Sequence, residues 1–308
     1  MFKIFCGHAA LQEATGFPLP KPTSELALLF GLLDKAPDEP RYIDLVKHCK
    51  ENIQYIESIN DEFDVACLPY KFSSGQDTMM LRLNDACKER NKKLYCFYND
   101  DNDRDFNLDS NIQLYRTSFY KSTKKENEFA IPAFVADTYD RTIVEELSIG
   151  YCGTHFGARE HLLQQIEKSP WKTNIIRRKH FQAKELPPEQ AKQEFLNNMS
   201  NNMFSFCFRG DGNFSYRFYE IMMMGRIPLL VNTDCVFPFE EQWNLHEHCF
   251  VIEEKDMPDF KDRFETFVVT EDLQQMQLKN RNLWIKHFSP TGFVSSFIES
   301  HSYNGKQQ

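Results

Sequence analysis

Residues 204–231 constrain the fold of this chain more than any other stretch. Phe204–Phe208 is an apolar run of strand length, and Gly210 and Gly212 follow it closely. Glycine lets the backbone turn sharply or approach a ligand, so these residues indicate a tight loop. A helical pattern comes next and leads into Ile227–Val231, a second apolar strand. The order of strand, loop, helix and strand predicts a mostly parallel α/β sheet.

The helix predicted within this stretch has two faces. Its apolar face, at helical spacing, consists of Phe214, Phe218, Ile221 and Met222. Its polar face consists of Tyr216, Arg217 and Glu220. We expect Asn213 or Ser215 to cap the N-terminus of the helix and Gly225 to end it at the C′ position.

The polar side of this unit suits an anion. A helix N-terminus presents unpaired N–H groups and a partial positive charge, which favour phosphate. Arg209 and Arg217 flank that end and are placed to hold a diphosphate, while the Glu220 carboxylate can accept hydrogen bonds from sugar hydroxyls. The alternative is an ordinary strand–turn–helix unit with an Arg–Glu surface pair, because glycine loops before helices are common.

The same residues resemble a family signature. Arg-Gly-Asp-Gly-Asn-Phe-Ser-Tyr-Arg-Phe-Tyr-Glu (209–220), Gly-Arg-Ile-Pro-Leu-Leu-Val-Asn-Thr-Asp (225–234) and Pro238-Phe239 are similar to the signature of exostosin-like glycosyltransferases. The resemblance implies an α/β fold of the GT-B type, in which two Rossmann-like domains face a cleft. It further implies that the C-terminal domain binds the nucleotide-sugar donor and that the C-terminal helix crosses back to the first domain.

The donor site is assigned from this resemblance and from positions at strand ends. The residues assigned to donor binding are Gly153, Arg177, Arg209, Gly210, Asp211, Gly212, Asn213, Ser215, Arg217 and Glu220. Gly153 and Arg177 each end a predicted strand, where α/β sheets bind ligands. The resemblance implies inversion at the anomeric carbon, with positive groups and helix N-termini in place of a metal ion. We therefore expect no metal and no cofactor beyond the nucleotide sugar, with a UDP-sugar as the preferred donor.

The catalytic base is not identified by the sequence. It should come from a loop of the first domain, and the candidates are His8, Glu13, Asp77 and Asp137. Each of them also fits a structural or capping role. Asp77 in particular fits the first turn of a helix, where the helix dipole favours a carboxylate.

Length and strand order predict two domains and a C-terminal helix. The chain has 308 residues, which suits two domains of about 150 residues each. We expect a Rossmann-like acceptor-side domain over residues 1–144, a nucleotide-sugar-binding domain over 145–288 and a helix over 289–308. The predicted strands are 2–6, 64–70, 93–98, 112–116, 129–135, 149–153, 175–177, 204–208, 227–231 and 250–252. Further helices are predicted over 24–33, 42–59, 75–88, 187–201, 259–267, 273–287 and 290–300.

Composition and charge exclude several classes of protein. The net charge of −9 argues against a general nucleic-acid binder. Nine scattered cysteines without C-x-x-C spacing argue against zinc and disulfides and favour a cytoplasmic protein. No apolar run reaches about 18 residues, so no transmembrane segment is expected, although peripheral contact with a membrane is compatible with the sequence. The acidic run Asn99–Asp105 lacks EF-hand spacing and is predicted to be a solvated loop.

Three functions were weighed against these patterns. The leading one is an inverting glycosyltransferase that uses a nucleotide sugar and acts on a glycan or glycolipid acceptor. The alternative is a nucleotide-sugar or glycan-binding module of the same fold without catalysis. A Rossmann oxidoreductase is disfavoured, because Gly7 stands alone after the first strand and no G-x-G-x-x-G follows it.

Overall fold

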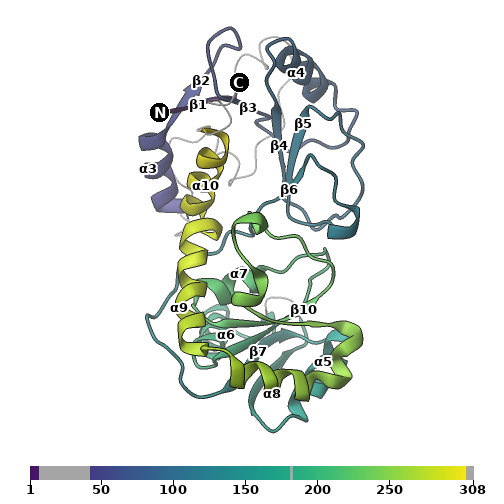
Figure 1. Ribbon diagram of the computed structural model, residues 1–308, viewed down its shortest axis with the longest axis vertical. Helices are drawn as coiled ribbons and strands as arrows, with labels where there is room; N and C mark the ends of the chain where they lie inside the picture. The colour runs from purple at the N-terminus through teal and green to yellow at the C-terminus, as the bar shows by residue number, and fades with distance from the viewer. Residues whose placement is uncertain (7–41, 181–182, 303–308) are drawn as a thin grey trace. The chain divides into compact units, whose positions relative to one another are not determined.

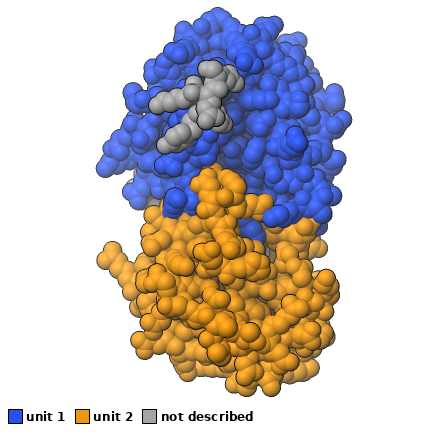
Figure 2. Space-filling view, viewed as in Figure 1, with its two compact units in different colours: residues 1–136, 236–238, 286–308 blue, residues 137–235, 239–285 orange. Residues whose placement is uncertain are grey.

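The computed structural model describes residues 1–6, 42–180 and 183–302 (Figure 1). The chain forms two compact units, which Figure 2 distinguishes by colour. Unit 1 consists of residues 1–136, 236–238 and 286–308, and unit 2 of residues 137–235 and 239–285. Each unit contains a parallel sheet with helices, so the predicted α/β class with two Rossmann-like halves is confirmed.

Unit 1 is built on a six-stranded parallel sheet in the order β2-β1-β3-β4-β5-β6. Its strands are β1 (Phe2–Phe5), β2 (Ile53–Ile56), β3 (Val65–Cys67), β4 (Leu94–Tyr98), β5 (Ile112–Arg116) and β6 (Glu128–Ala130). Its helices are α3 (Ile43–Asn52), α4 (Thr78–Lys88), the short η2 (Lys121–Thr123) and α10 (Pro290–Ser302). The apolar residues between the sheet and α4 form a buried core that includes Phe5, Met80, Leu83 and Cys96.

The C-terminal helix α10 packs in unit 1 through aromatic rings. The Phe297 ring lies 5.5 Å from the rings of both Tyr95 and Tyr115, in edge-to-face geometry. Such pairs contribute about 0.5–1.5 kcal/mol each beyond the burial of their area. The Ser295 hydroxyl also lies 3.0 Å from Nε2 of His48 on α3. The predicted return of the C-terminal helix to the first domain is confirmed.

A buried ion pair joins β5 to β6. Arg116 and Glu128 are only 2% and 5% exposed, and Nη1 of Arg116 donates to Oε1 of Glu128 over 3.0 Å. Nη2 of Arg116 donates to the carbonyls of Asn102 and Arg104 over 3.0 Å each. The run Asn99–Asp105 is therefore a loop, as predicted, but its backbone is held in place by the sheet below it.

Unit 2 has a five-stranded parallel sheet in the order β11-β10-β9-β7-β8. Its strands are β7 (Ser148–Thr154), β8 (Lys172–Arg178), β9 (Phe204–Cys207), β10 (Ile227–Asn232) and β11 (Phe250–Glu253). Its α-helices are α5 (Ala158–Glu167), α6 (Pro188–Ser200), α7 (Tyr216–Met223), α8 (Phe260–Thr270) and α9 (Leu273–Leu283). Short helical turns η4 (Glu240–Gln242), η5 (Leu245–Glu247) and η6 (Glu254–Asp259) lie in the loops, and the π-helical turn η7 (Trp284–Phe288) follows α9.

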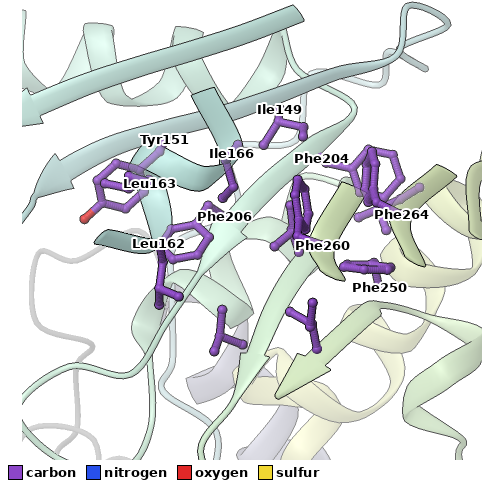
Figure 3. Packing of buried hydrophobic residues seen from close by; sticks show 14 of the residues in the cluster. Ile149, Tyr151, Leu162, Leu163, Ile166, Phe204, Phe206, Phe250, Phe260 and Phe264 are labelled. Carbon is purple, nitrogen blue, oxygen red and sulfur yellow. The ribbon is translucent and has the colours of Figure 1, made fainter. Parts of the chain in front are cut away.

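Helices cover both faces of the unit 2 sheet. On one face, Phe264 of α8 packs against Phe204 of β9 and Phe250 of β11, with ring centroids 4.8 and 5.1 Å apart (Figure 3). On the other face, Gly150 lets α6 approach the sheet closely. A Cβ atom at Gly150 would lie 3.0 Å from the side-chain oxygen of Asn198 on α6. These edge-to-face ring pairs account for some of the 28 phenylalanine residues of the chain.

The segment 137–144 belongs to unit 2, whereas the sequence had placed the division after residue 144. The side-chain amide of Gln277 exchanges two hydrogen bonds of 3.0 Å with the backbone of Val144. The two terminal nitrogens of Arg281 donate to the carboxylate of Asp137 over 2.9 and 2.6 Å. These contacts with α9 hold the segment that leads out of unit 1 against unit 2.

The helix predicted over 42–59 is wrong in its second half. Helix α3 ends at Asn52, and Ile53–Ile56 forms strand β2, which pairs in parallel with β1. Ile53, Tyr55 and Ile56 are β-branched or aromatic, and such residues favour strands over helices. They explain why this part of the chain forms an edge strand of the sheet rather than a continuation of α3. The loop predicted over 15–22 and the helix predicted over 24–33 lie outside the described residues.

We predict that Glu128→Gln destabilises the protein by about 3–5 kcal/mol, because it leaves the buried charge of Arg116 without its counter-ion. The free energy of unfolding from urea denaturation measures this change. The matched control is Glu62→Gln, which removes a carboxylate that is 88% exposed and paired with Lys3. That variant should be indistinguishable from the wild type. An equally small effect at Glu128 would contradict the role given to the buried pair.

Candidate functional site

The candidate site lies at the carboxyl end of β7 and in the loop that follows its neighbour β9. The two strands pair in parallel, so their carboxyl ends lie at the same edge of the sheet. Arg217, in the first turn of α7, reaches this edge, and its Nη2 donates to the carbonyl oxygen of Cys152 over 2.7 Å. Its guanidinium also lies 4.5 Å from the ring centroid of Tyr151. The cation predicted for the donor site is therefore held at the end of β7.

Gly153 makes this position of Arg217 possible. A Cβ atom at residue 153 would lie 2.7 Å from Nη2 of Arg217 and 3.1 Å from the hydroxyl of Tyr151. Any side chain at this position would compete with the guanidinium for space. The sequence linked Gly153 and Arg217 only through the donor they were assigned to, whereas the structure brings the two residues into direct contact.

The loop between β9 and α7, which we call the donor loop (residues 209–214), is closed by its own bonds. The N–H of Gly210 donates to the carbonyl of Phe214 over 2.9 Å. The buried amide of Asn213 donates to the carbonyl of Asp234 over 3.1 Å and accepts from the hydroxyl of Thr233 over 2.8 Å. The donor loop is thus bound to the loop that follows β10.

Several local predictions for this loop are corrected. Asn213 does not cap α7, because its side chain binds Asp234 and Thr233 instead. Ser215 is the N-cap residue by position, but its side chain makes no capping hydrogen bond. Of the described glycines, those with a positive φ are Gly157 and Gly225, so neither Gly210 nor Gly212 has a left-handed backbone. Asp211 is exposed on the loop and Gly212 is buried.

Helix α7 follows the predicted pattern. Phe218, Ile221 and Met222 are buried, as the apolar stripe required. Gly225 has φ of 63°, and its N–H donates to the carbonyl of Met222 over 3.1 Å. The next N–H, that of Arg226, donates to the carbonyl of Ile221 over 3.0 Å, which completes a Schellman motif. The C-terminus of the helix predicted from sequence is confirmed.

Glu220 is the unusual carboxylate of the site. It lies one turn after Arg217 on α7 and is half-buried. Within residues 1–6, 42–180 and 183–302, no hydrogen bond to its carboxylate is formed. Burial raises the pKa of Glu220, and the nearby charge of Arg217 opposes this shift. An enclosed carboxylate without hydrogen-bond donors is costly to the fold, and such groups are concentrated at functional sites.

Arg209 is placed at the start of the donor loop by Arg159, a residue that the sequence reasoning missed. Nη2 of Arg159 donates to the carbonyl of Arg209 over 2.7 Å. The charge of Arg209 opposes the rise that burial causes in the pKa of the Cys235 thiol. The position of Arg159 just after the turn that follows β7 could have suggested a role at the site. Sequence spacing could not identify its hydrogen-bond partner, Arg209, which lies 50 residues away.

Arg177 is bound differently from the other predicted cations. Its Nε donates to Glu160 over 2.9 Å, and its two terminal nitrogens donate to Glu167 over 2.8 and 2.7 Å. Hydrogen bonds from Arg177 lower the pKa of both carboxylates, and bonds to them raise the pKa of Arg177. The assignment of Arg177 to donor binding stays a prediction, and a ligand at this residue would have to compete with two carboxylates.

Of the four candidates for the catalytic base, Asp77 and Asp137 lie among the described residues. Asp77 caps α4, with its carboxylate accepting from the N–H groups of Met79 and Met80 and from the hydroxyl of Tyr70. Asp137 forms the bidentate ion pair with Arg281 described above. His8 and Glu13 lie outside the described residues. Asp77 and Asp137 therefore both have structural roles, Asp77 as a helix cap and Asp137 in an ion pair.

Two searches of the described residues gave negative results. No cluster of three or more His, Cys, Asp or Glu side chains in the described part of the chain is arranged to bind a metal ion. None of the described helices combines the length and the apolar character needed to span a bilayer.

Comparison with known proteins gives weak similarities. No protein-family model and no curated protein sequence matches the chain. A glycosyltransferase from Rickettsia africae is similar over 100% of this chain and 99% of its own, with 11% identity and a TM-score of 0.45. HepE from Anabaena in complex with UDP is similar over 98% and 100%, with 10% identity and a TM-score of 0.47. WaaG, a glycosyltransferase involved in lipopolysaccharide biosynthesis, is similar over 98% and 100%, with 9% identity and a TM-score of 0.39. Because these TM-scores lie below 0.5, the resemblances carry no weight in assigning a function.

We predict that Gly153→Ala displaces the side chain of Arg217 from the carbonyl of Cys152 while the fold is kept. The new methyl group would meet the flexible end of an arginine, which can move at little cost. A crystal structure and a thermal unfolding curve of the variant check both parts. Gly210→Ala is the control, since the nearest atom to its Cβ would be 3.6 Å away. Finding Arg217 unmoved in Gly153→Ala would contradict the contact described here.

Proposed function

We propose that this chain is an inverting glycosyltransferase that transfers a sugar from a nucleotide sugar to a hydroxyl of a glycan or glycolipid. A UDP-sugar is the preferred donor. One observation carries the proposal: Glu220 lies half-buried, one helical turn from Arg217 at the end of β7, and no described residue donates a hydrogen bond to its carboxylate. A ligand that supplies hydroxyl donors next to an anionic group would satisfy both residues, and a nucleotide sugar has both features.

The proposed roles follow from chemistry at the two ends of the ligand. Arg217 and Arg209 bind the diphosphate and stabilise the charge that it gains as it leaves. Glu220 accepts hydrogen bonds from hydroxyls of the ribose or of the donor sugar. The acceptor oxygen loses its proton to a base and bonds to the anomeric carbon, while the bond from that carbon to the diphosphate breaks. The arginines thereby supply the positive charge that a metal ion would otherwise provide.

The base is sought among the four candidates from the sequence. Asp77 and Asp137 already use their carboxylates as a helix cap and in an ion pair. His8 and Glu13 are therefore the first of the four candidates to test by substitution. The chain is proposed to act in the cytoplasm, which is compatible with its nine cysteines, none of which forms a disulfide.

The second candidate function is a nucleotide-sugar or glycan-binding module without catalysis. One observation favours it: neither of the base candidates that the structure describes has an uncommitted carboxylate. Such a module would bind the donor through the same arginines and Glu220. It differs from the enzyme in one measurable respect, because it would not turn over.

We predict that UDP-sugars raise the thermal unfolding midpoint of the protein in a screen that includes UDP, GDP, dTDP and CMP sugars and NAD. Ligands that bind only the folded state stabilise it by mass action. Release of UDP in the presence of glycan and glycolipid acceptors, with EDTA or with Mg²⁺, then tests transfer and its independence of metal. Binding without release on any acceptor would favour the inactive module. Stabilisation by NAD alone would contradict both.

We predict that Glu220→Gln abolishes most transfer but makes the protein more stable at pH 7. The pKa of Glu220 is raised in the folded state, so the ionised carboxylate disfavours folding above that pKa. This penalty disappears below the unfolded pKa, where the side chain is protonated in both states. The gain in unfolding midpoint should therefore be present at pH 7 and shrink towards pH 4. Loss of transfer together with loss of stability at pH 7 would instead indicate that Glu220 is a structural residue.

A further inference from the structure

Arg159 links the ends of the two strands that form the candidate site. It is the second residue of α5 and follows the turn that leaves β7. Nη1 of Arg159 donates to the carbonyl and the hydroxyl of Thr154 over 3.0 and 2.9 Å, at the end of β7. Nη2 donates over 2.7 Å to the carbonyl of Arg209, just beyond the end of β9. One planar group thus spans the gap between two neighbouring strand ends.

We propose that Arg159 is a positioning residue that fixes the donor loop in the shape that binds the diphosphate, an inference that rests on the proposed function. The far end of the donor loop is anchored by the Asn213 side chain, and the loop is closed by the bond from Gly210 to Phe214. Arg159 anchors the near end, at the residue whose side chain is assigned to the diphosphate. Loss of this bond would remove an anchor of the Arg209 backbone without touching its side chain.

The geometry distinguishes a role in positioning from a role in charge. The three acceptors of Arg159 are two carbonyls and a hydroxyl, all of them neutral. A guanidinium carries its donors in a rigid planar fork, so it can reach acceptors on two strands at once. A lysine ammonium is a compact point charge on a flexible stem and cannot reproduce that bridge. Arg159→Lys therefore keeps the charge and loses the position.

Arg217 and Arg159 both bond to the end of β7, which explains why the near end of the donor loop needs this support. Arg217 bonds to the carbonyl of Cys152, and Arg159 bonds to the carbonyl of Thr154, on either side of Gly153. The first turn of α7 and the start of the donor loop are thereby both positioned by hydrogen bonds that involve the end of β7. If the near end of the donor loop shifts, Arg209 changes its position relative to Arg217. The two guanidinium groups can then no longer bind the same diphosphate.

The test compares Arg159→Lys and Arg159→Met with the wild type in the full-length chain. Hydrogen–deuterium exchange of backbone amides over residues 205–216, without nucleotide, reports on the donor loop. Calorimetric titration with UDP, GDP, dTDP and ADP reports on binding. Loss of hydrogen bonds to a charged group should speed exchange about tenfold or more in both variants and raise the Kd of the bound nucleotide by about the same factor. The control is Arg263→Gln on α8, which breaks a partly exposed pair with Asp256 of η6 and should match the wild type.

Each result decides the matter. Slow hydrogen–deuterium exchange of the donor loop in Arg159→Met would overturn the proposal. A wild-type Kd in Arg159→Lys would also overturn it, because the charge at residue 159 alone would then suffice for nucleotide binding. If Arg159→Met does not fold, Arg159→Lys carries both measurements. If the wild type binds none of the four nucleotides, the proposed function fails. The exchange rates still show in that case whether Arg159 fixes the loop.

Discussion

The candidate site depends on hydrogen bonds between arginines and the last carbonyls of β7. Arg217 of α7 bonds to Cys152, and Arg159 of α5 bonds to Thr154. The pairing of β7 with β9 ends at Gly150. Backbone carbonyls beyond that point need other hydrogen-bond donors, and the two guanidinium groups supply them. Gly153 between them has no side chain to interfere. Two helices and the donor loop therefore take their positions from three residues of one strand.

One carboxylate in this arrangement, that of Glu220, is half-buried. The surrounding bonds hold the backbone of the donor loop and the guanidinium of Arg217, but none of the described residues donates a hydrogen bond to the Glu220 carboxylate. Natural proteins accept such a loss of stability where activity requires it. We therefore propose Glu220 as the residue that separates a ligand site from an ordinary strand–turn–helix unit, which is the alternative that the sequence leaves open.

The sequence predicted the elements of unit 2 better than their partners. The strand Phe204–Cys207, the buried face of α7 and the Gly225 terminus depend on local periodicity and backbone geometry, which neighbouring residues determine. Hydrogen-bond partners depend on residues far along the chain. Arg159 lies 50 residues from its acceptor Arg209, and the carboxylates that bind Arg177 lie on a different element from it. Strand-end position could therefore nominate Arg177 and could not show that it is paired.

We propose that the end of β7, the donor loop and α7 together bind a nucleotide sugar. The decisive experiment is a crystal structure of the protein with UDP. We predict diphosphate oxygens about 3 Å from the guanidinium groups of Arg209 and Arg217, with the Glu220 carboxylate accepting a hydrogen bond from a ribose hydroxyl. UDP bound elsewhere on the chain, with Arg217 and Glu220 uninvolved, would contradict it.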